Sequence, residues 1–253
     1  YDATFTTARV SSNGNLQLNP FSSSVNDSAL IILNSVFVNT LSFNRFSSKW
    51  GLDLNNTLNR SKALLTYGYE SRVLKDWSLK SRWNITRSIL VDATGRKGIN
   101  RLLNSNPKFG NRNYNIQQYI IEPRISFTKG SNFRVVVGYK LTDKKNAEGD
   151  REKSVNHSLN TEFKYNILQS TSIQSKFTYS SIRFTSMNPV PNTNSPAVYI
   201  MLDGLLPGKN FLWSIDLTRR LSNNLEINIQ YEGRKPGSSR IVHVGRASIR
   251  ALL

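Results

Sequence analysis

The chain has 253 residues, of which 38% are hydrophobic, 10% aromatic and 20% charged, and its net charge is +18. This composition is too apolar and too aromatic for a disordered chain. The absence of cysteine excludes a disulfide scaffold and thiolate chemistry, and two histidines, His157 and His243, are too few for a His-rich metal site. The sequence has no run of about 18 apolar residues, so no transmembrane helix is expected. Because it begins at Tyr1 without a signal peptide, the chain is expected to be a mature form or a piece of a longer protein.

Residues 1–48 form a predicted N-terminal segment, separate from the rest of the chain. Tyr1–Val10 is a candidate strand, and residues 11–28 are expected to form a loop. Residues 29–43 (ALIILNSVFVNTLSF) are partly apolar and extended in character. They predict one or two further strands, or a segment that lies in the lumen of a barrel.

From residue 49 to the end, apolar and polar residues alternate with a period of two, which is typical of β-strands. Most of the predicted strands have about ten residues or more, whereas strands of soluble proteins average about five to six. A tilted strand needs about nine to eleven residues to cross a bilayer. About ten strands are predicted, and the alternation within them is clearest at 50–55, 65–70, 77–89, 119–127, 133–141, 159–165, 173–179, 211–220, 225–232 and 240–253.

The predicted connections fall into two alternating sets. The short set is 74–75, 129–130, 166–170 and 222–224, and the other set, near 59–61 and at 93–112, 144–151, 186–209 and 235–239, contains the long loops. Outer-membrane barrels have short periplasmic turns and longer outer loops, in this same alternation. The pattern therefore favours an antiparallel transmembrane β-barrel with ten to twelve strands visible in this chain, either complete or part of a larger barrel.

Charges and aromatic residues support this interpretation. The apolar faces carry only Arg87, Arg183 and Arg219, all near predicted strand ends, where a long side chain reaches the membrane interface. Aromatic residues at strand ends predict two interfacial girdles. The girdle on the short-turn side contains Trp50, Trp77, Phe127, Phe133 and Tyr165, and the other contains Tyr119, Tyr139, Tyr179, Phe211, Trp213 and Tyr231.

The polar faces supply the candidate site. Arg246 and Arg250 of the last strand are predicted to face Glu226 and Glu232 of the strand before it. Such charges would either set the selectivity of the lumen or form structural pairs that satisfy buried charges. The predicted lumen-facing charges are Lys80, Arg82, Glu122, Arg124, Glu226, Glu232, Arg246 and Arg250.

Three stretches carry a family resemblance: RSKALLTYGYESR (60–72), SPAVYIMLDGLLPGKNFLWSIDLTRRL (195–221) and NLEINIQYEGRKPGSSRIVHVGRASIRALL (224–253). They resemble the C-terminal barrel region of large, mostly uncharacterised outer-membrane proteins of Bacteroidota. The resemblance spans about residues 40–253 and implies an outer-membrane barrel and a longer parent chain. It transfers no catalytic residue. Such chains often end in an aromatic residue, whereas this one ends in Leu253.

The predicted loops suggest further contacts. Bases flanking two outer loops are predicted to bind lipopolysaccharide phosphates. They are Lys144, Lys145, Arg151 and Lys153 around one loop, and Arg234, Lys235 and Arg240 around the other. The apolar piece 197–206 is expected to fold into the lumen, to dock a partner, or to extend a strand above the membrane. Asp27-Ser28-Ala29 matches the short pattern that Bacteroidota O-glycosylate, which makes Ser28 a predicted acceptor.

We expect no enzyme activity, no metal site and no cofactor. His243 and Ser248 lie on opposite faces of the last predicted strand, so no triad of histidine, carboxylate and serine converges there. The sequence favours a non-enzymatic outer-membrane β-barrel that belongs to an envelope transport, export or assembly complex, or to a longer parent protein. Its expected partners are membrane lipid, lipopolysaccharide and other envelope proteins, but not nucleic acid, since the bases form no motif. A free-standing small pore and a soluble, basic all-β binding domain remain as alternatives.

Overall fold

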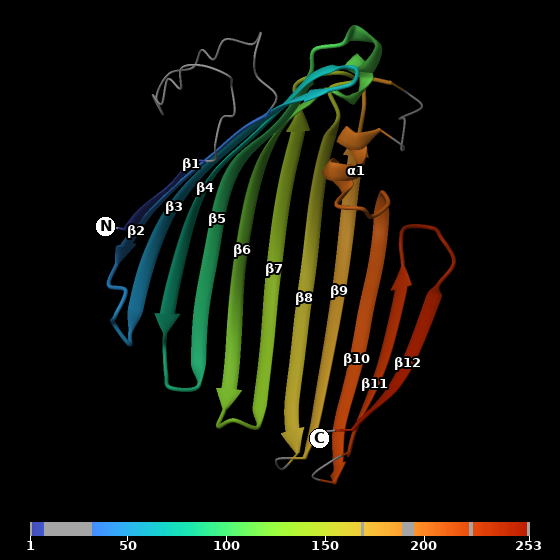
Figure 1. Ribbon diagram of the computed structural model, residues 1–253. Helices are drawn as coiled ribbons and strands as arrows, with labels where there is room; N and C mark the ends of the chain where they lie inside the picture. The colour runs from blue at the N-terminus through green and yellow to red at the C-terminus, as the bar shows by residue number, and fades with distance from the viewer. Residues whose placement is uncertain (1, 8–31, 168–169, 189–194, 223–224, 252–253) are drawn as a thin grey trace.

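The computed structural model describes residues 2–7, 32–167, 170–188, 195–222 and 225–251. Nearly all of them belong to one sheet of twelve strands (Figure 1). The strands are β1 (Asp2–Thr7), β2 (Ile32–Phe43), β3 (Trp50–Leu65), β4 (Gly68–Asn84), β5 (Ile89–Asn104), β6 (Tyr114–Lys129), β7 (Phe133–Asn146), β8 (Lys153–Ile167), β9 (Thr171–Thr185), β10 (Gly208–Ser222), β11 (Leu225–Lys235) and β12 (Val242–Ala251). A 3-10 helix, η2 (Pro107–Arg112), follows β5, and the helix α1 (Pro196–Leu202) precedes β10. No described helix has the length and apolar character needed to cross a membrane.

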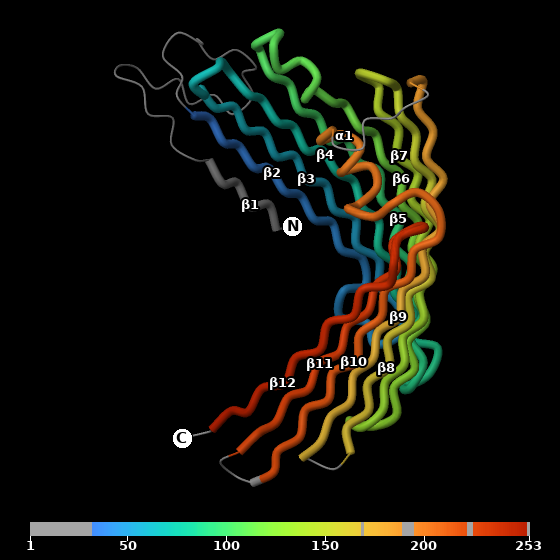
Figure 2. The backbone as a smooth tube through the Cα atoms, turned by 90° about the vertical axis from the view of Figure 1, so that its right-hand side faces the viewer, coloured from blue at the N-terminus to red at the C-terminus, as the bar shows by residue number. Residues whose placement is uncertain are grey.

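Each strand pairs antiparallel with its neighbours in the sequence, in the order β1 to β12 without a crossover. The prediction of an all-β antiparallel sheet is confirmed, and its twelve strands match the upper predicted number. The sheet curves into an open trough, and β1 and β12 form its two edges (Figure 2). The strands β1 and β2 continue the sheet formed by the later strands, since β2 pairs with β3 from Ile32 to Phe43.

The connections at the two ends of the strands differ in length. At one end, residues 44–49, 85–88 and 130–132 make short turns, and only three residues separate β8 from β9 and two separate β10 from β11. At the other end the connections 105–113, 147–152, 186–207 and 236–241 are longer, and one tight turn lies at 66–67 (Figure 1). The predicted alternation of short turns and long loops is confirmed from β5 onwards.

The strand boundaries predicted between residues 49 and 112 are wrong. Leu74 and Lys75, predicted as a turn, lie inside β4, and residues 59–61 lie inside β3. The true turns are at 66–67 and 85–88, each inside a predicted strand. Residues 93–104, predicted as part of a long loop, form most of β5. Three strands are nevertheless present in this region, so the predicted number of strands is unaffected.

Pro123 lies in the interior of β6, where a proline removes one ladder hydrogen bond. The register between β6 and β5 is continuous past it, with Pro123 opposite Ala93. On the other side, the pairing of β6 with β7 is interrupted between Ile121 and Arg124. The proline is therefore accommodated by a local gap in one ladder.

The convex face carries an apolar band. Large hydrophobic side chains such as Leu79, Ile125 and Ile229 stand exposed on it in β2 to β4 and in β6 to β12, and in β5 the band is formed by the half-buried Ile89 and Val91. On β6 the band runs from Phe127 to Tyr119, eight residues or roughly 26 Å along the strand. That length fits the apolar band of an outer-membrane barrel, which is about 25 Å tall.

Aromatic residues border this band on both sides. Phe43, Trp50, Trp83, Phe127, Phe133 and Tyr165 lie toward the short turns, and Trp77, Tyr119, Tyr139, Tyr179, Phe211, Trp213 and Tyr231 lie toward the long loops. Trp77 was predicted in the other girdle. That assignment is wrong because it depended on the turn at 74–75, and Trp83 takes its place beside Trp50.

Beyond the band, toward the long loops, the strands continue and both faces become polar. On the convex face this region carries Lys75, Lys97, Arg101, Lys145 and Lys153. Lys97 lies over the ring of Tyr119, with Nζ 5.3 Å from its centroid. The predicted set of convex-face charges was therefore incomplete, and Arg87 lies in the turn 85–88 rather than in a strand. Lys97 lies at the border of the apolar band, level with Tyr119, and the other added charges lie outside the band, where they cost little.

The helix α1 lies on the concave side of the sheet (Figure 2). The side chain of its N-cap residue Ser195 accepts a hydrogen bond from the backbone N–H of Val198, 3.1 Å away. Asp203, in the left-handed conformation, ends the helix. The buried side chains of α1 pack against an apolar patch of the concave face that consists of Leu102, Tyr114, Ile116 and Ile182. Of the alternatives predicted for residues 197–206, the structure shows the inward fold.

Candidate functional site

The concave face is the polar face of the sheet, and it is the candidate site. Along each strand, the residues on the concave face alternate with the apolar residues on the convex face, and residues on the same face of neighbouring strands lie opposite each other in register. All eight charges predicted to face a lumen lie on this face: Lys80, Arg82, Glu122, Arg124, Glu226, Glu232, Arg246 and Arg250.

Between β4 and β6, arginines of this face pair with carboxylates. Both Nε and Nη2 of Arg124 bond to Oδ2 of Asp92, at 2.8 and 2.6 Å. Nε of Arg96 lies 2.6 Å from Oδ2 of Asp76. Farther toward the long loops, Arg72 lies 2.8 Å from Oε1 of Glu70. In each pair the carboxylate is largely covered, but the arginine side chain is 46–59% exposed to solvent, so the pair neutralises charge locally and adds only about 0–1 kcal/mol to stability.

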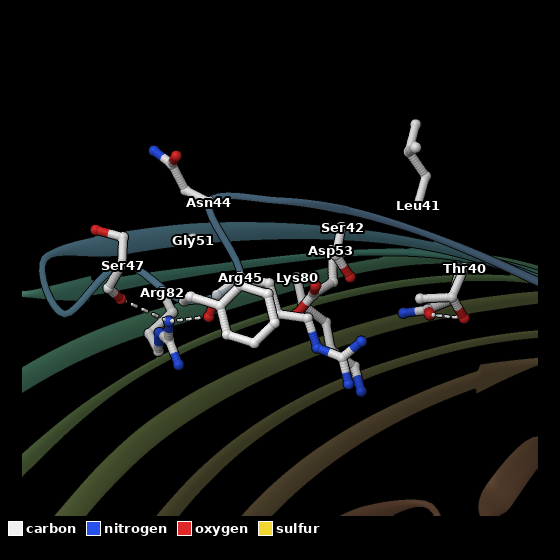
Figure 3. Close-up of a pocket in the computed structure, with 12 residues that line it drawn as sticks. Thr40, Leu41, Ser42, Asn44, Arg45, Ser47, Gly51, Asp53, Lys80 and Arg82 are labelled. Atoms are coloured by element: carbon white, nitrogen blue, oxygen red, sulfur yellow. Dashed lines mark hydrogen bonds between the residues drawn. The ribbon is translucent and has the colours of Figure 1, made fainter. Parts of the chain in front are cut away.

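At the short-turn end, β2, β3 and β4 border a hollow of about 1010 Å³. Figure 3 shows Thr40, Lys80 and Arg82 on the concave side of the sheet, whereas Leu41 points away from that side. The guanidinium of Arg82 donates to the backbone carbonyls of Arg45 and Ser47, at 3.4 and 3.1 Å. Arg82 therefore holds the turn 44–49 rather than standing free in a lumen.

Two further groups line the hollow. Lys80 lies opposite Asp53 in register, and the hydroxyl of Thr40 donates to Oδ1 of Asn55 at 2.8 Å. The ring of Phe46 is 97% exposed. The hollow is thus polar along the strands and apolar at the tip of the turn.

The charges of β11 and β12 differ in part from their predicted pairing. Glu226 lies between Arg250 on one side and Arg220 on the other, in register with both. Arg246, however, lies opposite Gln230, and Glu232 lies opposite Val244. Of the four residues of the predicted ladder, only Glu226 and Arg250 therefore face each other in the register between β11 and β12.

Lys144 was predicted to bind lipopolysaccharide, and that interpretation is wrong. Its side chain is on the concave face, 4% exposed, and Nζ donates to the backbone carbonyl of Ile200 at 2.8 Å and to Oδ1 of Asp203 at 2.5 Å. It therefore fastens the end of α1 to β7. The reason is that residue 144 lies within β7 with its side chain on the concave face, and does not belong to the loop that follows β7.

The other predicted loop bases are spread over both faces. Lys145 and Lys153 lie opposite each other on the convex face, and Arg234 lies on the concave face. Arg151 lies in the loop 147–152, Arg240 lies in the loop 236–241, and Lys235 ends β11 on the convex face. They do not form one patch.

The two histidines have the same environment. Nδ1 of His157 lies 2.6 Å from the hydroxyl of Tyr139, and Nδ1 of His243 lies 2.8 Å from that of Tyr231. Both pairs are exposed on the convex face at the long-loop border of the apolar band. Ser248 lies on the concave face, away from His243. Among the described residues, no group of three or more His, Asp or Glu side chains is arranged to hold a metal ion.

Two features of this face were not predicted. Asn210 is completely buried, and its side chain bonds to Leu206, Gly208 and Gly237, which joins the loop 186–207 to the loop 236–241. The apolar patch of the concave face that α1 covers was also not predicted. The apolar residues of 197–206, which pack against this patch, were the signal in the sequence that could have indicated it. Ser28 lies outside the described residues.

No protein-family model matches the chain, and no curated protein matches its sequence. Among solved structures, the NanC porin matches with 11% identity and a TM-score of 0.38, over 88% of this chain and 94% of the porin. The ferric preacinetobactin receptor BauA of Acinetobacter baumannii matches with 10% identity and a TM-score of 0.48, over 88% of this chain. The ferric citrate transporter FecA matches with 10% identity and a TM-score of 0.44 over 86%. The matches cover 42% of BauA and 37% of FecA.

The strand order and the two faces determine the fold class. The sheet is all-antiparallel, its long strands have an apolar convex face and a polar concave face, and aromatic residues border the apolar band. These are the features of a transmembrane β-barrel wall. The predicted fold class is therefore confirmed.

Proposed function

We propose that this chain forms part of the wall of a β-barrel in the bacterial outer membrane, as a non-enzymatic component of an envelope transport, export or assembly complex or of a longer parent protein. The observation that carries the proposal is a membrane-type sheet whose described strands do not close into a barrel, since β1 and β12 are not paired with each other. The convex face supplies the surface for lipid, and the concave face supplies a polar interior.

The convex face supports the membrane location. A soluble protein rarely exposes a contiguous apolar patch larger than a few hundred Å², and such a patch marks an interface with protein or membrane. Here large apolar side chains are exposed at the height of the band in β2 to β4 and in β6 to β12. Their border of aromatic rings and the convex-face lysines beyond it are the arrangement expected at the two surfaces of a bilayer.

The open edges support membership of a larger barrel. The strand β12 pairs with β11 from Val242 to Ala251, and among the strands that the structure describes none pairs with its other side. Much of β12 lies at the height of the apolar band, with Ile249 70% exposed. Unpaired backbone groups at that depth cost several kcal/mol each in hydrocarbon, so only closed barrels span membranes with strands. Further strands adjoining β12 meet this requirement.

The open edges also distinguish between the alternatives. A free-standing small pore requires β1 and β12 of one chain to meet, whereas they are the two ends of the sheet order, and Figure 2 shows β12 and β2, the neighbour of β1, on opposite sides of the open trough. A soluble binding domain would have to cover the convex face with other protein. We further propose membrane lipid and lipopolysaccharide as partners, with Arg151 and Arg240 of the long loops at the outer surface.

Fractionation tests the membrane location. The native protein, expressed from its own cells with an affinity tag, should remain with the outer-membrane fraction after carbonate and high-salt washes and should be released only by detergent. A tagged periplasmic protein from the same cells serves as the control. Recovery in the aqueous fraction would refute the proposal and leave the soluble-domain alternative.

A further inference from the structure

The acidic and basic residues of the concave face are unevenly distributed over the sheet. From β3 to β6 the face carries as many acidic as basic residues, and three arginines there form the ion pairs described above. These residues are Asp53, Glu70, Asp76, Asp92 and Glu122, with Arg72, Lys80, Arg82, Arg96 and Arg124. From β7 to β12 the face is strongly basic. Leaving out Lys144, which is paired with Asp203, it carries Arg134, Lys140, Lys164, Lys176, Arg220, Arg234, Arg246 and Arg250 against Glu162, Asp216, Glu226 and Glu232.

Three exposed cations gather near the short-turn end of this basic half. Arg134 of β7 lies directly opposite Lys164 of β8, and Lys176 of β9 lies opposite Glu162, the residue two positions before Lys164. Within the ranges that the structure describes, the side chains of Arg134, Lys164 and Lys176 make no hydrogen bond or ion pair. The amide of Gln174, which faces Lys164, donates to Oε1 of Glu162 at 3.4 Å.

This arrangement is unfavourable for the protein alone. Like charges that face each other directly across an antiparallel pair destabilise the sheet, and their Cβ atoms lie about 4.5–5.5 Å apart. Two carboxylates border these three cations, Glu162 opposite Lys176 and Asp216 opposite Gln174, so the cluster still has an excess of positive charge. An anion between the guanidinium of Arg134 and the ammonium groups would receive several charge-assisted hydrogen bonds and relieve the repulsion.

We propose that the β7–β12 half of the concave face binds and conducts anionic solutes that carry phosphate or carboxylate groups, with Arg134, Lys164 and Lys176 as its principal binding site. The inference rests on the proposed function, since it requires the concave face to line the interior of a membrane barrel. It adds the charge class of the solute. Charged side chains that line a pore set its ion selectivity by this kind of local attraction.

The test uses the assembly purified from its native membrane in mild detergent and reconstituted in planar bilayers. The reversal potential in a potassium chloride gradient gives the permeability ratio of chloride to potassium, and inorganic phosphate added on one side serves as the blocking probe. The variant is the triple substitution Arg134→Gln, Lys164→Gln and Lys176→Gln. The matched control is Lys97→Gln, Lys145→Gln and Lys153→Gln, which removes the same charge from the convex face.

The wild type should prefer chloride and be blocked by phosphate. The concave triple variant should lower the permeability ratio by roughly threefold or more and weaken the block, while the convex control leaves both unchanged. An unchanged ratio in the concave variant would overturn the inference, and so would a wild-type assembly that conducts no ions or prefers potassium. These outcomes differ from a failure of the proposed function, which would show as a protein that needs no detergent.

Discussion

The ammonium group of Lys144 lies 2.5 Å from Oδ1 of Asp203, a residue 59 positions later in the chain. The lysine is buried in the concave face, whereas the carboxylate side chain is 49% exposed. Nζ also donates to the carbonyl of Ile200 in the last turn of α1. One side chain of β7 thereby holds both the end of the helix and the residue that caps it.

Replacing Lys144 with methionine should loosen α1 from the sheet. The substitution leaves the carbonyl of Ile200 without this donor and removes the partner of Asp203, at a cost of about 1–3 kcal/mol. Limited chymotrypsin digestion of the detergent-purified protein should then cleave faster at Tyr199. The control is Lys145→Met, on the convex face. Equal cleavage rates in both variants and the wild type would show that the Lys144 contacts do not hold the helix.

Gly233 lies beneath the indole ring of Trp213, which is opposite it in register. A Cβ atom at Gly233 would fall 2.2 Å from Cε2 of Trp213. The Gly233→Ala variant should therefore push the ring away from His243, whose ring centroid is 6.0 Å from that of Trp213. We expect the free energy of unfolding to fall by about 1–3 kcal/mol, measured by urea denaturation and tryptophan fluorescence.

Gly245→Ala is the matched control for this prediction. Gly245 also lies on the convex face, and nothing lies within 4 Å of the position of its Cβ. It should unfold as the wild type does or slightly later. Destabilisation of both variants to the same extent would contradict the role given to the contact between Trp213 and Gly233.

Adjacent residues of β11 test which face meets lipid. Ile229 is exposed on the convex face within the apolar band, and Asn228 lies on the concave face. A lysine on the lipid face near the membrane midplane costs about 2–4 kcal/mol, so Ile229→Lys should reduce the amount of folded protein in the outer membrane. Asn228→Lys should lose only its hydrogen bond to Thr218, about 1 kcal/mol. The reverse order would place lipid on the concave face.

The sequence predicted the strands well where one face meets lipid and the other is polar. From β6 to β12 the period of two is uninterrupted within the apolar band, and Phe133, Val135 and Val137 occupy the predicted face. The same reasoning failed between residues 49 and 112. There the strands extend far beyond the band, both faces are polar, and β5 contains Gly95 and Gly98, so residues 93–104 resemble a loop.

The turns at 66–67 and 85–88 contain or adjoin glycine and threonine residues that favour turns, which an analysis of hydrophobic periodicity alone does not consider. Gly68, which follows the turn 66–67, has a φ of +123°, a conformation that favours glycine. In the turn 85–88 the hydroxyl of Thr86 accepts hydrogen bonds from the backbone N–H groups of Ser88 and Ile89, at 3.2 and 3.0 Å. Serine and threonine are weak sequence signals for a turn, so Ile85 was predicted to lie in a strand.

The candidate site was predictable in part. Alternation alone puts a charge such as Arg124 on the polar face. The ion pair of Arg124 with Asp92 and the burial of Lys144 depend on register and on α1, which joins residues far apart in the sequence. Neither follows from local pattern.

The proposed function requires that strands outside residues 1–253 adjoin β12 in the membrane. A photo-reactive amino acid at Ser248, on the concave face of β12, tests it in intact cells. A matched probe at Asn160, in β8 between two paired strands, should cross-link only within the chain. We predict that the Ser248 probe gives one specific product whose partner peptide alternates apolar and polar residues, in a detergent-purified particle heavier than the 28.7 kDa chain. A product that joins Ser248 to β1 of the same chain, in a particle of one chain, would contradict the claim and establish a small closed barrel.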